Sequence, residues 1–243
     1  MIDFSDLFSI KQGDRNKFCS KIIETSAPHG DFYFLVMLSS LVVALGLLAN
    51  NIILVIGGMV IAPILSPILA LALGLVINEP KVILRSLKIF FFTFIFVFTL
   101  TGVVGIFAST SIKDLELIQI MKPSMFNFFV SLVAGLAASY TWAKPRLDET
   151  LPGIAITVTL IPPLSAVGLA FSSGEFWLAG EAFKTFLLNT MGIVSASLVT
   201  FSLMDFYKAK KKLVEEVKEE EKIIEKNKKE KQKEKEEKKN NNN

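Results

Sequence analysis

Six long apolar stretches constrain the fold of this 243-residue chain more than any other feature of its sequence. A helix needs about 20 mostly apolar residues to cross a hydrocarbon layer about 30 Å thick. Inside lipid, every backbone N–H and C=O must be bonded within the protein, which favours helices. The sequence therefore predicts an all-α polytopic membrane protein with six transmembrane helices. These are expected at Phe32–Ala49, Ile52–Ile77, Leu87–Ala108, Phe126–Ala143, Ile154–Phe171 and Phe186–Met204.

Polar residues gather near the two ends of the chain and divide it into three regions. Residues 1–30 mix apolar and charged positions, which is typical either of a helix on the membrane surface or of a short cytoplasmic helix packed on the bundle. Residues 31–205 hold the six spans, and the lipid bilayer is their expected surrounding. Residues 206–243 are a Lys/Glu-rich tail, predicted to be a solvated cytoplasmic helix. Because its lysines are matched by glutamates, no nucleic-acid binding is expected.

Lysine and arginine residues are shared unevenly between the loops on the two sides of the predicted bundle. Short loops that are rich in these residues tend to stay in the cytoplasm. One side holds most of them, including those near both chain ends, whereas the other holds only Lys113, Lys122 and Lys184. The sequence thus predicts a multi-pass protein of the cell membrane with both termini in the cytoplasm.

Prolines interrupt the second and the fifth apolar stretch. Pro63 and Pro67 lie within MVIAPILSPILA, and Pro162 and Pro163 lie within LIPPLSAVGLA. A proline inside a helix removes a backbone hydrogen bond and costs roughly 3 kcal/mol. The sequence predicts two broken helices, with simple packing kinks as the alternative, since proline is frequent in membrane helices.

The two halves of the apolar region, about 31–108 and 126–204, resemble each other. FYFLVMLSSLVVA, from Phe32, matches FNFFVSLVAGLAA, from Phe126, at several positions, and the second span of each half carries a proline pair. Each half holds three spans, and an odd number makes the second half enter the membrane from the opposite side. This predicts a three-plus-three inverted repeat, in which paired broken helices line a site near the middle of the membrane. Chance similarity between apolar segments is the alternative.

Small residues, polar residues and prolines at the two breaks are the candidates for a substrate path. Asn189, in the sixth span, is the most polar buried candidate and is expected to hydrogen-bond between helices. Glu181 and Lys184, three residues apart on a helix, are either an exposed interfacial ion pair or charges that gate a vestibule. The predicted path comprises Gly57, Gly58, Pro63, Ser66, Pro67, Pro162, Pro163, Ser165 and Asn189.

The two proline segments also resemble a known family. VIGGMVIAPILSPILALALGL and LPGIAITVTLIPPLSAVGLAF are similar to segments of the prokaryotic integral membrane proteins grouped as domain of unknown function 389, the uncharacterised hydrophobic domain family. The resemblance covers roughly Phe32 to Met204. It implies a fold of membrane helices but no activity, substrate or catalytic residue. Many members have small residues of the glycine type where this chain has Leu65 and Ser66.

The sequence contains no motif typical of catalysis or metal binding. HExxH, GxSxG, a Walker loop and Cys/His clusters are all missing, so no enzyme, cofactor or metal is expected. The middles of the predicted spans hold no ionisable residue, which disfavours a proton relay. We expect a small transporter or channel for an inorganic ion or small solute. Small residues that recur four apart favour a homo-oligomer. The alternative is a non-transporting scaffold that recruits a cytoplasmic protein partner through its tail.

Overall fold

The computed structural model describes residues 8, 10, 12–108, 115–119, 122–144, 147, 160–209, 214–215, 217–219, 222–223 and 226. All regular structure among these residues is helical. The 3-10 helix η3, Phe206–Ala209, follows the last long helix. The α-helices are α2 (Gln12–Thr25), α3 (Gly30–Leu48), α4 (Ile52–Ile61), α5 (Leu65–Val76), α6 (Pro80–Phe107), α7 (Glu116–Gln119), α8 (Met125–Ala143), α10 (Ile161–Ser172) and α11 (Phe176–Leu203).

Four helices, α3, α6, α8 and α11, are long and apolar enough to cross a membrane, and the bent pair α4 and α5 makes a fifth candidate span. The all-α membrane fold is therefore confirmed. The described part of the predicted fifth span is α10, which has only 12 residues. Residues 154–159 lie outside the described residues, so the count of six spans stays a prediction.

Two predicted helix boundaries were wrong by several residues. Helix α6 begins at Pro80 rather than near Leu87, because proline is well suited to the first turn and the charged side chains that follow can reach the interface. Helix α11 begins at Phe176 rather than Phe186. Apolar content alone sets the beginning of a span too late when charged residues occupy the first turns of the helix.

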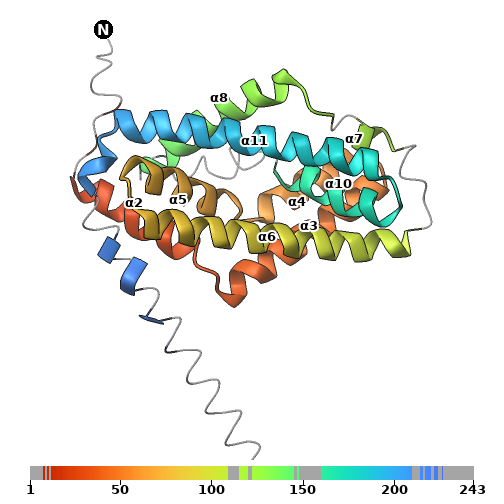
Figure 1. Cartoon of the computed structure of the whole chain (residues 1–243), viewed down its shortest axis with the longest axis horizontal. Coiled ribbons are helices and arrows are strands. Elements are labelled where there is room, and N and C mark those ends of the chain that lie inside the picture. The colour runs from red at the N-terminus through yellow and green to blue at the C-terminus, as the bar shows by residue number, and fades with distance from the viewer. Residues whose placement is uncertain are drawn as a thin grey trace, which may run out of the picture.

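Helices α6 and α11 have 28 residues each and lie antiparallel across the whole length of the bundle (Figure 1). A shorter helix precedes each of them: α5 leads into α6, and α10 leads into α11, after two tight turns of the same design. Asn78 and Gly174 adopt positive φ values of 52° and 78°, as residues after a helix C-terminus commonly do. The turns therefore place α5 and α10 at opposite ends of the bundle.

Glycines allow the helices to approach closely. A Cβ added at Gly192 of α11 would lie 2.8 Å from the Phe128 carbonyl oxygen of α8. A Cβ added at Gly58 of α4 would lie 3.1 Å from the Ser39 carbonyl oxygen of α3, and the Ser39 hydroxyl donates to the Gly58 carbonyl at 2.7 Å. Small residues at such crossings favour association of membrane helices, because the backbones gain dispersion contacts there.

Helix α2 is packed on the bundle, and its place relative to the membrane surface stays a prediction. Its apolar side chains Phe18, Cys19, Ile22 and Ile23 are buried against α5 and the end of α11. Val217, in the predicted solvated tail, is buried in the same cluster. The prediction of a solvated tail was therefore wrong at Val217, because its apolar side chain joins this buried cluster. The tail from residue 227 onward lies outside the described residues.

Candidate functional site at the starts of two half-length helices

The second span is broken at Ala62, Pro63 and Ile64, where α4 and α5 meet at an angle of 54°. Pro63 lies in the break itself, and Pro67 is the third residue of α5. A proline in a first turn costs little, because the N–H groups of that turn have no partner within the helix. The predicted break of this span is confirmed.

Helix α10 begins with Pro162 and Pro163 at its second and third positions. These prolines start a helix rather than interrupt its middle, and the residues before 160 lie outside the described part. In apolar surroundings an N–H without a partner costs free energy. Two successive prolines remove two such groups, which explains why this sequence can begin a helix among apolar side chains.

The starts of α5 and α10 both lie near the middle of the bundle. A 12-residue helix is about 18 Å long and a 28-residue helix about 42 Å. Helix α5 ends where α6 begins, and α10 ends at the opposite side, where α11 begins (Figure 1). Each half-length helix therefore points its N-terminus, the positive end of its dipole, from its own side toward mid-depth.

One buried face of α6 packs against both half-length helices. In its first half, a Cβ added at Gly74 of α5 would lie 3.0 Å from a methyl group of Val82. In its second half, a Cβ added at Gly168 of α10 would lie 2.6 Å from the Phe98 carbonyl oxygen. Thr93 lies on the same buried face between these two contacts, at mid-length of α6. Asn189 has the same place in α11 and is also buried.

Three buried hydroxyls near this level differ in their partners. The Ser66 hydroxyl lies 2.9 Å from the Pro63 carbonyl and 3.1 Å from the Thr25 carbonyl, so it ties the break to the end of α2. Neither Ser165 Oγ nor Thr93 Oγ1 has a hydrogen-bond partner within the described structure. Their side chains are buried, with exposed fractions of 0% and 2%.

The other predicted path residues fall outside this group. Gly58 is occupied by the close contact with α3, and nothing lies within 4 Å of a Cβ added at Gly57. Lys184 donates to Glu181 Oε1 at 2.8 Å, and the Lys184 side chain is 59% exposed. The geometry of this pair fits the exposed-ion-pair alternative.

The sequence analysis did not select Thr93. It could have done so, because Thr93 lies 96 residues before Asn189, at the corresponding position of the first half of the predicted repeat.

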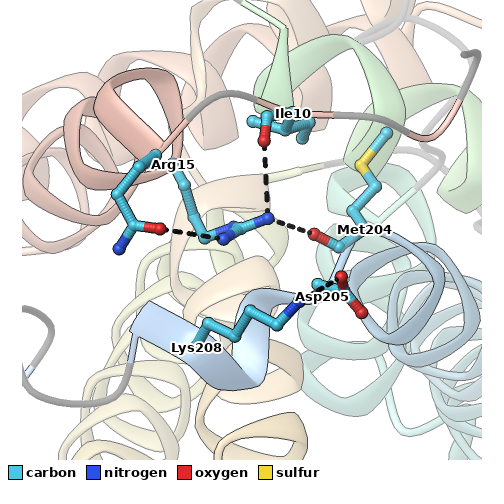
Figure 2. Close-up of polar contacts among 6 residues, drawn as sticks. Ile10, Arg15, Met204, Asp205 and Lys208 are labelled. Atoms are coloured by element: carbon cyan, nitrogen blue, oxygen red, sulfur yellow. Dashed lines mark hydrogen bonds and ion pairs between the residues drawn. The ribbon is translucent and has the colours of Figure 1, made fainter.

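A second polar cluster, which we call the terminal cluster, consists of Arg15, Met204, Asp205 and Lys208 and joins the two ends of the described chain (Figure 2). Arg15 Nη2 donates to the Met204 carbonyl at 3.1 Å, and the guanidinium lies 5.8 Å from the centre of the Phe206 ring. Arg15 is only 5% exposed. Sequence reasoning missed this role, which an arginine beside the apolar positions Phe18 and Ile22 could have indicated.

Asp205 and Lys208 form an exposed ion pair of 2.7 Å in the terminal cluster. The hydrogen bond from Lys208 holds the pKa of the Asp205 carboxyl below its ordinary value, and the same bond raises the pKa of Lys208. Asp205 adopts a positive φ of 56° after the end of α11. Within the described residues no group of three or more His, Cys, Asp and Glu side chains is placed to hold a metal ion.

The fold and these helix starts define a membrane-embedded helical protein, and comparison with known proteins gives its family. The family described as Domain of unknown function (DUF389) matches residues 59–195, which include α5, α6, α8, α10 and most of α11. The chain belongs to this family. An uncharacterised protein of Methanocaldococcus jannaschii is 28% identical over 168 residues, which cover 69% of this chain and 52% of that protein. The chain thus spans about half the length of this relative. No solved structure matches.

Proposed function

We propose that this protein is a small transporter or channel, and that its solute crosses the membrane at the starts of α5 and α10. One observation carries the proposal: two helices of 12 residues each run from mid-depth to opposite ends of the bundle. Helices that begin inside a membrane leave backbone groups to be satisfied there, and they are found where a chain lines a polar cavity. Packing alone does not require two such helices of equal length.

The six-span inverted repeat is part of this proposal. Helix α5 begins at Leu65 and α10 at Ile161, 96 positions later, and α6 begins at Pro80 and α11 at Phe176, again 96 positions later. The equal lengths within these pairs, and the 19 residues of both α3 and α8, support two halves of the same design. The antiparallel course of α6 and α11 supports the inverted orientation (Figure 1).

We propose that both termini lie in the cytoplasm and that the protein forms a homo-oligomer. Arg15, Lys17 and Lys21 of α2 lie at the same end of the bundle as Lys208 after α11, which supports a cytoplasmic location of both termini. Exposed phenylalanines such as Phe91 and Phe92 favour contact with lipid or with a second copy in a homo-oligomer. We propose no enzymatic activity, cofactor or metal.

A non-transporting scaffold is the second candidate function. Val217 is buried in the same apolar cluster as α2 and α5, so this part of the tail is attached to the bundle and could present the following residues to a protein partner. Removal of residues 227–243 separates the two functions. Solute flux survives this deletion in a transporter, whereas capture of a partner is lost in a scaffold.

Solute flux into sealed liposomes tests the transport function. The purified full chain, with Cys19 replaced by Ser, is placed under gradients of a cation, an anion and a neutral solute. In the same background, Thr93→Cys is treated with a small thiol-reactive reagent, and Ser139→Cys on α8, whose native hydroxyl bonds the Gly135 carbonyl, is the matched control. We expect flux that the reagent reduces only in Thr93→Cys. Absence of flux for all three solutes from folded protein would refute the transport function.

A further inference from the structure

The two half-length helices bring the positive ends of their dipoles to mid-depth of the bundle. Helices α5 and α10 contain no charged residue and direct the positive ends of their dipoles to this level. The acidic residue of α11, Glu181, lies in its first third and is paired with Lys184. Neither half-length helix therefore carries a carboxylate of its own that would compensate its positive end.

The donors at this level are hydroxyls rather than backbone N–H groups. Pro162 and Pro163 have no N–H, and the Leu164 N–H already bonds the Leu160 carbonyl at 3.4 Å. Thr93 Oγ1 and Ser165 Oγ are buried and have no hydrogen-bond partner in the described structure. A buried hydroxyl left without a partner costs about 1–3 kcal/mol, and a ligand that accepts its hydrogen bond would remove this cost.

The register of α6 against α10 gives the levels of these two hydroxyls along the bundle. A Cβ added at Gly168 would meet Thr101 Oγ1, and one added at Gly105 would meet Ser172 Oγ. In both contacts the residue of α10 is 67 positions after that of α6, so the helices run in parallel with a constant register. The same register places Thr93 level with Leu160, at the start of α10, and Ser165 lies just over one turn further along α10.

We infer that the starts of α5 and α10, together with Thr93 and Ser165, form a binding site for a small inorganic anion. Positive helix ends and buried hydroxyl donors favour an anion over a cation. An uncharged solute would satisfy the hydroxyls but would gain little from the helix dipoles. This anion site rests on the proposed transport function and names the class of its solute.

Anion selectivity of the full-length protein in liposomes is the test. Chloride or nitrate flux is compared with potassium flux for the native chain, Thr93→Val and Ser165→Ala. Neither substitution removes a hydrogen bond of the described structure, so both variants should fold. Thr101→Val is the matched control, since it removes a buried threonine hydroxyl from the same face of α6, and that hydroxyl already bonds the Val97 carbonyl at 2.8 Å.

We expect anion flux that exceeds potassium flux and falls roughly tenfold or more in Thr93→Val and Ser165→Ala, because each loses a hydrogen bond to a charged ligand. The Thr101→Val variant should keep most of the native flux. Selective flux of potassium or of a neutral solute would overturn the anion site and leave the transport function standing. Anion flux that is unchanged in both variants would overturn the placement of the site. Absence of all flux would overturn both the anion site and the transport function.

Discussion

Helices α5 and α10 have the same length and the same place before a long helix, but they differ in what surrounds their starts. The position of the start of α5 is fixed by hydrogen bonds and packing, because the Ser66 hydroxyl bonds backbone carbonyls and α2 packs on the neighbouring residues. In the first turns of α10 and at mid-length of α6, Ser165 and Thr93 have buried hydroxyls without partners among the described residues. The two half-length helices thus resemble each other in length and position, but the hydroxyls near their starts differ in hydrogen bonding. The Ser66 hydroxyl stabilises the fold, and the Ser165 hydroxyl is the one that we propose for ligand binding.

The contact between α6 and α10 provides the largest expected effect on stability. In Gly168→Val the new side chain would press on the Phe98 carbonyl oxygen, 2.6 Å from the Cβ position, which is a backbone atom and cannot turn away. We expect a loss of about 3 kcal/mol, the upper end of the usual range for overpacking, in the free energy of unfolding, measured by tryptophan fluorescence during heating in detergent. Gly57→Ala is the control, because nothing lies within 4 Å of its Cβ position, and its helix should gain up to about 1 kcal/mol. Equal stability of both variants would contradict the close packing of α10.

The attachment of α2 beside α5 depends on Arg15. The Arg15→Met variant keeps a long side chain but leaves the Met204 carbonyl without its donor. We expect a loss of about 1.5–3 kcal/mol in the same unfolding measurement, because the lost hydrogen bond involves a charged group in a buried place. Lys17→Met, on the exposed face of α2, should change stability much less. A neutral effect of Arg15→Met would show that the apolar side chains alone hold α2.

Substitution of the serines near the two helix starts tests directly whether the starts of α5 and α10 differ in hydrogen bonding. Ser66→Ala should cost about 1 kcal/mol, because its hydroxyl satisfies backbone carbonyls. Ser165→Ala should leave stability unchanged or raise it slightly, since no bond within the described structure is lost. Thermal unfolding of both variants in one detergent measures the difference. A larger loss of stability in Ser165→Ala than in Ser66→Ala would contradict the hydrogen bonding described for the two serines.

The smallest effect concerns the exposed pair of Asp205 and Lys208. Because the folded-state pKa of Asp205 is lowered, its contribution is present above the unfolded-state pKa of about 3.9 and is lost as the pH falls through the lower folded value. Asp205→Asn keeps the positive φ acceptable and removes only the charge. We expect a slight fall of the melting temperature at neutral pH and no difference from the native chain once Asp205 is protonated. A constant difference at all pH values would assign the effect to the turn instead of the ion pair.

Individual residues show which structural features could be predicted from the sequence alone. The turn between α3 and α4 is encoded locally: Asn50 has a φ of 50°, which asparagine tolerates, and the Asn51 side chain accepts from the Ile53 N–H at 3.0 Å. The prolines were predicted as helix breaks, and the structure places Pro63 in a break and Pro67, Pro162 and Pro163 in first turns, where a missing N–H needs no partner. Arg15 and Thr93 were not predicted, because their roles depend on segments far away in the sequence.

The sequence by itself determined the membrane helices, the position of the proline break in the second span and the family. Apolar runs and prolines act on the local backbone, and their effect does not depend on the rest of the chain. Only the tertiary structure decided which buried hydroxyls are satisfied and which are available, because a hydrogen bond depends on distance and direction between helices. Ser66 and Ser165 are both serines beside a proline-marked helix start, and only packing against the end of α2 gives Ser66 its Thr25 carbonyl partner.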